Sequence, residues 1–337
     1  MNEFTGRETI VPIHLTNELN PPPIQIECLD DESGLGYLLR WLGANHLPFR
    51  WLKGKLGIKG PRLPDARDAI ALSHLTGIGH KQIKRILMES FGNSQEGGMM
   101  VYGQQLLFKD LYRFRSPQVC INCIHQKGYI SRNWEFGPIP VCIEHGTYLI
   151  DRCGHCKKAI SWDRPAIDVC QCKRILAGDP KDVEQPIAQE LNLAQWVLKP
   201  LLQNTLDVSQ TLTPKAPAWI NSLSLDGALR IVKAFGVCEQ PHQAIPSSFP
   251  WGRCSSTYWR DIFKRAAIRI EQFINDPASP ELQTLVYQPF LGGLAAKPLT
   301  AADKDAALYL LKEIFNYKPL TRFGGGKGHL SQRRLFD

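Results

Sequence analysis

The chain has 337 residues, of which 43% are hydrophobic and 21% are charged. At about 150 residues per domain, this length predicts two domains or three small ones, and the composition excludes a wholly disordered chain. No stretch approaches the roughly 20 consecutive apolar residues of a membrane-spanning helix. Residues 1–20 lack the basic-then-apolar order of a secretory signal. We therefore expect a cytoplasmic protein without membrane contact.

The formal net charge is +8, because 40 lysine and arginine residues outnumber 32 aspartate and glutamate residues. Such a charge favours contact with polyanions without establishing it. If seven cysteines bind two zinc ions as thiolates, as argued below, the net charge falls to about +5. The excess of positive charge is therefore modest.

Residues 1–30 predict an irregular N-terminal arm. Residues 21–23 are three consecutive prolines, which favour a stiff extended backbone. Residues 24–26 resemble a short strand. Such an arm packs on a partner or a neighbouring domain, or it is a disordered leader.

Residues 31–115 predict a helical domain that begins with two helices. Ser33 is suited to cap the first helix, whose leucines repeat at helical spacing at Leu35, Leu38, Leu39 and Leu42. Pro48 suits the first turn of the second helix. The expected buried face of that helix is Trp51, Leu52 and Leu56. We expect the unit to end at residues 57–61, which contain two glycines and a proline.

A second pair of helices follows, joined by a short turn at residues 76–79 that contains two glycines. Asp65 opens the first of them, and the expected inward residues of the pair are Ala66, Ala69, Ile70, Leu75, Ile83, Ile86 and Leu87. Two amphipathic helices around such a turn are typical of a helix-turn-helix fold. The second helix starts near His80, and in DNA-binding versions it enters the major groove.

Seven polar side chains on these helices are candidates for contact with nucleic acid or a partner. They are Arg50, Lys53, Lys55, Lys81, Gln82, Lys84 and Arg85. Arginine and lysine bind phosphate, and glutamine can read adenine. The alternative is an ordinary solvated helix face.

Seven of the ten cysteines lie between Cys120 and Cys172. In a chain without a secretory signal, this clustering favours metal binding in a reducing compartment over a disulfide scaffold. The predicted ligands are Cys120, Cys123, Cys142, His145, Cys153, Cys156, Cys170 and Cys172. Each closely spaced pair directs two ligand atoms at one ion, and two pairs complete the tetrahedron that zinc prefers. Residues 116–176 therefore predict a module with two structural zinc ions.

The pairing of these ligands is less certain than their identity. Sequential pairing gives a site of three cysteines and one histidine, followed by a four-cysteine site, whereas a cross-braced arrangement joins the first pair with the third. We favour sequential pairing because each half is a compact unit. His125 and His155 are possible substitutes for His145. Cys28, Cys238 and Cys254 lack a partner at ligand spacing and are expected to be ordinary small hydrophobic residues.

We predict no catalytic residue. Both metal sites can be filled by four protein ligands, whereas a catalytic zinc keeps an open position. A treble-clef nuclease would need a further catalytic histidine, and residues 124–141 supply no convincing one. The sequence also lacks a nucleophile elbow, a dinucleotide-binding fingerprint and a kinase signature.

Residues 177–322 predict a C-terminal helical domain, after a polar linker at 177–215 that contains one helix at 187–198. Further helices are expected at 225–236, 258–274, 282–290 and 301–315. The long helix should expose Arg260, Lys264, Arg265 and Arg269, and Asp303 and Asp305 should be surface charges. Residues 323–337 predict a flexible, glycine-rich basic tail, since the spacing of a phosphate-binding loop is absent.

The fold class is therefore mostly α, with an N-terminal helix-turn-helix-like domain, a central tandem zinc-finger module and a C-terminal helical domain. Several of its features occur in the order found in one family: Asp31-Glu32-Ser33, Arg113-Phe114, Cys120, Cys123, Trp134, Cys142-Ile143-Glu144-His145-Gly146, Tyr148-Leu149, Cys153 and Cys156. Over roughly residues 30–175 the chain resembles the TniQ/TnsD family of transposon target-selection proteins. The specific part is the Cys-x-x-His-Gly segment and the Leu-x-x-x-Cys-x-x-Cys that follows it. Ile121, where the family often has proline, and Lys173, where it often has glycine, leave the subfamily open.

The resemblance implies a bacterial, non-enzymatic protein that connects a target site to the transposase through an AAA+ regulator. In one branch the protein docks as a homodimer on Cascade, a guide-RNA CRISPR effector. In the TnsD-like branch, whose members tend to be longer, it binds attachment-site DNA directly. The chain length and modest charge favour the Cascade branch, because base pairing with the guide then reads the sequence. The alternatives are the TnsD-like role, a zinc-containing transcription regulator and, last, an enzyme.

Overall fold

The computed structural model describes residues 20–91, 97–179, 184–202, 218–246, 249 and 251–317. Within these ranges the protein is mostly α, with eleven α-helices and five short strands. The expected tail at 323–337 and most of the expected arm lie outside the described residues. Among the described helices, none is long and apolar enough to cross a membrane.

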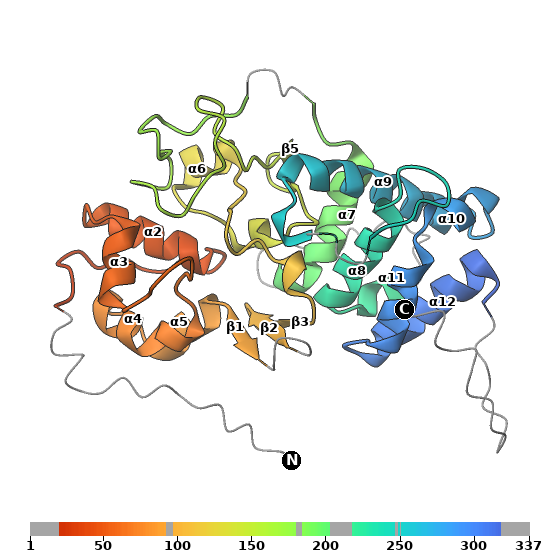
Figure 1. Ribbon diagram of the computed structural model, residues 1–337, viewed down its shortest axis with the longest axis horizontal. Coiled ribbons are helices and arrows are strands. Elements are labelled where there is room, and N and C mark those ends of the chain that lie inside the picture. Colours follow the sequence, from red (N-terminus) through yellow and green to blue (C-terminus); the bar gives the residue numbers. More distant parts are fainter. Residues whose placement is uncertain are drawn as a thin grey trace, which may run out of the picture. The chain divides into compact units, whose positions relative to one another are not determined.

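The chain forms two units, each assembled from separate stretches of sequence. The first unit comprises Met1–Gly103, Arg113–Glu135 and Leu149–Val183, and the second comprises Gln104–Tyr112, Phe136–Tyr148 and Glu184–Asp337. Figure 1 colours both along the sequence.

The first two helices are α2 (Gly34–Ala44) and α3 (Phe49–Lys55). The Ser33 hydroxyl accepts the Gly36 amide and caps α2, as the sequence predicts, and the four predicted leucines of α2 are buried. Pro48 occupies the N-cap of α3 rather than its first turn. Leu52 is buried as expected, but Trp51 and Leu56 are only half-buried. Phe49 fills the core in their place, because a helix of two turns buries only one narrow stripe.

The second pair consists of α4 (Ala69–Thr76) and α5 (His80–Ile86), preceded by a 3₁₀ turn at Ala66–Asp68. Asp65 caps this turn, and Gly77 ends α4 with φ +74°, a conformation that glycine adopts without strain. The prediction for Ile70 is wrong: its side chain is 41% exposed. The helix starts only at Ala69, after the 3₁₀ turn, so its buried face is rotated toward Leu72 and Leu75.

Residues 89–106 contain strands, which the helical interpretation of 31–115 missed. They are β1 (Glu89–Phe91), β2 (Gly98–Val101) and β3 (Gln104–Leu106), in the order β1-β2-β3. β1 and β2 are antiparallel, with Ser90 opposite Met99. Tyr102 and Gly103 both have positive φ, as a two-residue hairpin turn requires. Tyr-Gly is a weaker turn signal than Asn-Gly, which is why the sequence pattern does not predict this hairpin.

Residues 24–26 do not form a strand. Instead, the Asn45 side chain binds the backbone of Ile24, accepting its N–H at 2.9 Å and donating to its carbonyl at 2.8 Å. The Gln25 amide donates to the Leu75 carbonyl at the end of α4. This extended segment therefore packs on the helices through side-chain amides.

The N-terminus of α2 is tied to the segment that follows α6 (Ile121–Lys127). The Ser33 amide donates to the Ile130 carbonyl at 2.7 Å, and its hydroxyl donates to the buried Glu135 carboxylate at 2.6 Å. The Tyr129 hydroxyl donates to Asp31. Hydrogen bonds therefore join segments of the first unit that are distant in the sequence.

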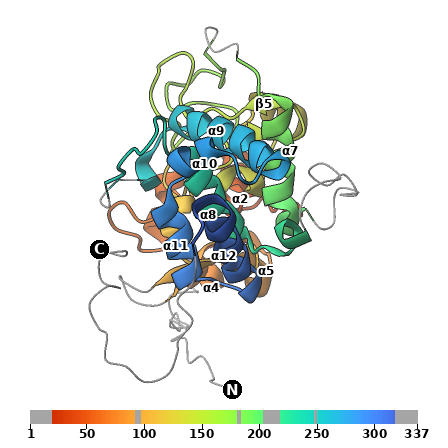
Figure 2. The same ribbon diagram turned by 90° about the vertical axis from the view of Figure 1, so that its right-hand side faces the viewer.

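The helices of the second unit are α7 (Ala188–Leu198), α8 (Leu225–Gly236), α9 (Ser256–Asn275), α10 (Pro280–Leu285), α11 (Gln288–Ala296) and α12 (Ala301–Phe315). Every residue of α8 is buried, and α7, α9, α11 and α12 pack around it (Figures 1 and 2). The prediction of one helix at 282–290 is wrong. Val286 and Tyr287 are extended, and a new helix begins at Gln288 with Pro289 in its first turn, because proline cannot continue the preceding helix.

Asp303 is fully buried, so its prediction as a surface charge is wrong. Its carboxylate accepts the Ser224 amide at 2.9 Å, the Ser224 hydroxyl at 2.7 Å and the Thr300 amide at 3.0 Å. A Cβ atom on Gly227 would lie 2.2 Å from this carboxylate. Asp303 therefore holds the starts of α8 and α12 together. Asp305 is exposed as expected.

The basic face predicted for α9 is also wrong. Arg260 and Arg269 are buried, and Lys264 and Arg265 are half-buried. One Arg269 nitrogen donates to the carbonyls of Phe235, Cys238 and Leu285. This arginine satisfies backbone groups where α8 and α10 end, and such partners cannot be recognised from helical periodicity.

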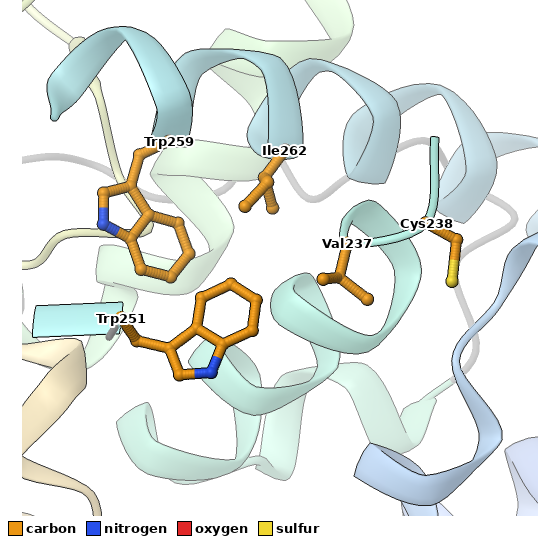
Figure 3. Close-up of a cluster of buried hydrophobic side chains, with 5 residues drawn as sticks. All are labelled: Val237, Cys238, Trp251, Trp259 and Ile262. Carbon is orange, nitrogen blue, oxygen red and sulfur yellow. The ribbon is translucent and has the colours of Figure 1, made fainter. Parts of the chain in front are cut away.

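A cluster of apolar side chains fills the space between α8, α9 and the turn at Trp251–Arg253 (Figure 3). Trp259 and Ile262 come from α9, Val237 and Cys238 follow α8, and Trp251 faces them. The rings of Trp251 and Trp259 lie 5.7 Å apart. Cys238 has the buried position expected of a non-ligand cysteine.

Candidate metal centres

The first candidate centre combines a helix start with a hairpin corner. Cys120 caps α6, and Cys123 lies in the first turn of that helix. Cys142 ends β4 (Val141–Cys142), and His145 precedes β5 (Thr147–Tyr148), which pairs with β4. The Gly146 amide donates to the Cys142 carbonyl at 2.9 Å and closes the corner. Gly146 has φ +58°, which a side chain would strain.

The four ligand atoms of this group, three sulfurs and one imidazole nitrogen, all lie within 4.8 Å of one another. The Cys142 sulfur is 3.8 Å from His145 Nδ1. With zinc–ligand bonds of about 2.0–2.3 Å, the edge of a tetrahedron is about 3.5–3.8 Å. The three cysteines are at most 2% exposed and His145 is half-buried. The group therefore matches one tetrahedral ion in a largely buried site.

The second candidate centre is built from two tight turns without helix or strand. Cys153 and Cys156 belong to one turn, and Cys170 and Cys172 belong to the other. Their four sulfurs also lie within 4.8 Å of one another, with Cys156 and Cys170 at 3.7 Å. Cys156 and Cys172 are half-buried. This centre has the same ligand spacing as the first but lies closer to solvent.

Backbone hydrogen bonds close the two turns in the same way. The amides of Lys157 and Lys173 donate at 2.8 Å to the carbonyls of Cys153 and Cys170, the first cysteine of each turn. The amides of these first cysteines donate in return to the carbonyls of Lys158 and Arg174. Because each turn is closed on itself, the backbone that carries each pair of cysteines is held in a defined conformation.

Glycine is required inside the first of these turns. A Cβ atom on Gly154 would lie 2.1 Å from the Gly178 carbonyl oxygen, and the Gly154 amide donates to the Ala177 carbonyl at 2.9 Å. The chain that leaves the module therefore passes directly over the turn.

Burial governs the electrostatics of the second module. It raises the pKa of the Cys170 thiol to about 12, so this sulfur keeps its proton at neutral pH unless a metal ion displaces it. Arg164 is also buried, which lowers the pKa of its guanidinium to about 10. Its nitrogens donate to the carbonyls of Ser161, Ala166 and Ile167. A divalent ion with four thiolates carries a net charge of −2, which a nearby arginine offsets in part.

The structure brings the eight predicted ligand residues together in two groups in sequential order, not in a cross-braced arrangement. His125 and His155 are exposed and belong to neither group. Each group could hold a metal ion. The thiolate and imidazole donors fit zinc, and four donors in each group match a structural rather than a catalytic site.

The corner that carries Cys142 and His145 is anchored by residues that no sequence pattern identifies. The Tyr148 hydroxyl, on β5, donates to both oxygens of the Glu190 carboxylate at 2.9 and 3.0 Å. Arg260 lies 4.0 Å from the centre of the Tyr148 ring. Burial raises the pKa of both Glu190 and Tyr148. Only the position of Glu190 in the first turn of a helix was readable from the sequence.

The predicted contact residues on α5 are solvent-accessible. Lys81, Gln82, Lys84 and Arg85 are all exposed, and Lys84 forms an ion pair with Glu89 at 3.2 Å. On α3, Arg50 and Lys55 are exposed, whereas Lys53 is half-buried and donates to the Gly60 carbonyl at 2.6 Å. These positions agree with a contact surface and with a solvated helix face alike.

A family model described as TniQ matches residues 23–149 of the chain. No curated protein matches it significantly. The matched region contains both helix pairs, the β1–β3 strands and all four residues of the first candidate centre, and it ends before the second. Over residues 23–149 the chain is therefore similar to TniQ proteins.

Proposed function

We propose that this protein is a non-enzymatic target-selection adaptor of a transposon, which docks as a homodimer on Cascade and recruits an AAA+ transposition regulator. The observation that carries the proposal is the similarity to TniQ proteins over residues 23–149, which supports a transposon-associated function of TniQ/TnsD type. The adaptor acts in the bacterial cytoplasm.

Two structural zinc ions stabilise the protein in this proposal, one in each group of four ligands. The first is bound by Cys120, Cys123, Cys142 and His145, and the second by Cys153, Cys156, Cys170 and Cys172. The support is the donor chemistry together with the close approach of the ligand atoms in each group. Ions of this kind supply folding free energy and no reaction step.

The size of α5 favours an adaptor over a protein that reads its target alone. The helix has seven residues, which corresponds to a length of about 10 Å at 1.5 Å per residue. A helix of this length reaches few base pairs. In a guide-directed system, base pairing supplies the remaining specificity.

A second candidate is a TnsD-like protein that binds its attachment-site DNA directly. The observation that favours it is the exposed group Lys81, Gln82, Lys84 and Arg85 on the second helix of the α4–α5 pair. In this role the cations bind phosphates and Gln82 reads a base.

A pull-down separates the two candidates. The purified protein is offered guide-loaded Cascade, and separately duplex DNA that carries the transposon attachment site, at moderate salt. We expect retention on Cascade and weak, salt-sensitive binding to DNA. Tight sequence-selective DNA binding without retention on Cascade would establish the TnsD-like role instead.

Two further measurements complete the test. Replacing Lys81, Lys84 and Arg85 with glutamine should abolish site-selective binding in the TnsD-like case and leave Cascade retention unchanged. Multi-angle light scattering should give twice the 38.0 kDa chain mass if the adaptor is a dimer.

A further inference from the structure

The second candidate metal centre has basic residues at equivalent places on its two turns. Lys157 and Lys158 follow the last cysteine of the first turn, and Lys173 and Arg174 follow the last cysteine of the second. All four are exposed. Because the four sulfurs lie within 4.8 Å of one another, both basic pairs belong to one small module.

The backbone at these positions does not favour lysine. Lys157 and Lys173 have φ of +59° and +66°, in the left-handed region that favours glycine. A long cationic side chain nevertheless occupies both places. This repetition suggests that the charge, rather than the ease of the turn, determines the residue.

The existing contacts of these cations are weak. Lys157 pairs with Asp179 at 2.7 Å, but both side chains are substantially exposed, and such pairs are readily exchanged for another anion. Arg152, which is also exposed, donates only one nitrogen, to the Lys157 carbonyl. In the described parts of the chain, no ion pair involves Lys158, Lys173 or Arg174.

We infer that this face, formed by Arg152, Lys157, Lys158, Lys173 and Arg174 and here called the knuckle face, binds the phosphate backbone of duplex DNA without reading its sequence. The contact goes beyond the proposed adaptor role, because it concerns direct contact with DNA whichever way the target is chosen. We choose DNA as the ligand because the proposed adaptor function places the protein at a DNA target. In this choice of ligand, the inference rests on the proposed function.

The remaining chemistry of the module favours a duplex. Single-stranded nucleic acid is held by stacking its bases on exposed aromatic rings. Trp162, the one Trp, Tyr or Phe residue between 150 and 179, is 1% exposed, and its indole N–H donates to the Phe114 carbonyl. The acidic residues Asp163 and Asp168 lie between the two turns rather than on them.

The alternative role of these cations is to offset the −2 charge of a zinc ion bound by four thiolates. That role would stabilise the metal and would need no nucleic acid. The two hypotheses can be tested on the same variants. Phosphate binding predicts a change in DNA affinity, whereas charge compensation predicts a change in metal retention.

The test compares the full-length protein with a K158Q/R174Q variant, which removes one cation from each turn. Binding to random-sequence duplex DNA is measured by fluorescence anisotropy from 50 to 250 mM salt, without Cascade or other partners. Each lost phosphate contact lowers the slope of log K against log salt by about 0.9. We therefore expect the slope to fall by about 2, with metal content unchanged.

The matched control is K304Q/K312Q, which removes two exposed cations from α12. It should leave the slope unchanged. The charge-retaining variant K158R/R174K should bind as the unmodified protein does, which shows that charge rather than side-chain shape is required.

Three outcomes would overturn the inference. They are an unchanged slope in a folded, metal-loaded K158Q/R174Q protein, loss of one metal ion from that variant, or stronger competition by single-stranded DNA or duplex RNA than by duplex DNA. Each leaves the Cascade pull-down unaffected, so failure of this inference is distinguishable from failure of the adaptor proposal.

Discussion

The two candidate metal centres have the same kind of ligands but opposite surroundings. The first is enclosed, with cysteines at most 2% exposed, and its residues belong to a helix and a hairpin. The second consists of two turns, with two cysteines half-buried and exposed basic residues on both sides. The TniQ match includes the first and ends before the second. Ligand spacing therefore identifies a centre, but the elements around it decide what else the centre can do.

The largest expected difference between the centres is in stability. Replacing Cys142 with serine should release one metal ion and lower the free energy of unfolding by about 5 kcal/mol or more, because metal binding and folding are coupled. Replacing Cys156, which is half-buried in a turn, should release one ion with a smaller loss. Metal content by mass spectrometry and thermal unfolding by circular dichroism measure both. Equal losses of unfolding free energy in the two variants would show that the two centres do not differ in their contribution to stability.

The anchoring of the first centre is tested by Tyr148→Phe. The Glu190 carboxylate then loses a donor to both of its oxygens in a buried site, at a cost of about 2 kcal/mol. Because Tyr148 lies three residues after His145, we also expect weaker metal retention at the first centre only. A chelator titration that resolves the two ions checks this, and the second centre is the internal control. Equal weakening at both centres would contradict the assignment.

A glycine substitution tests the close packing of the second centre. Gly154→Ala should cost about 1–2 kcal/mol and loosen the second ion, because the added methyl group meets a carbonyl oxygen. Gly178→Ala is the matched control, since a Cβ atom there meets nothing within 4 Å. Urea unfolding and metal content should therefore separate the two variants. If they behave alike, the contact with Gly178 does not constrain the turn.

The smallest expected effect is at the surface of the second centre. Lys157→Gln removes the ion pair with Asp179. The two side chains are 58% and 39% exposed, respectively. The cost of this substitution should stay below about 1 kcal/mol, because exposed pairs contribute little and are screened by salt. Denaturant unfolding at low and high salt checks it. A larger loss would mean that the lysine has a structural role.

Much of the local structure was predictable because its causes lie close together in the sequence. The cap at Ser33 depends on residues three positions away. Ligands within one turn are two or three residues apart, so Cys120 with Cys123 and Cys153 with Cys156 could be recognised directly. The helices at 225–236 and 301–315 followed from their apolar repeats.

The errors that concern buried charges share one cause, which is a partner distant in the sequence. Asp303 looks like surface charge until Ser224, 79 residues away, donates to it. Arg269 looks like an exposed cation until the carbonyl of Phe235 accepts from it, 34 residues away. Helical periodicity places a charged residue on the outer face by default, so it cannot identify polar groups that join buried helix ends.

By itself, the sequence determined the mostly helical class, the eight candidate ligand residues and the resemblance to TniQ proteins, because caps, apolar repeats and ligand spacing are local properties. Tertiary structure alone decided which ligand pairs share a centre, how deeply each centre is buried and which charges are internal. These depend on segments separated by tens of residues, whose meeting is fixed by packing and by hydrogen bonds to buried backbone groups.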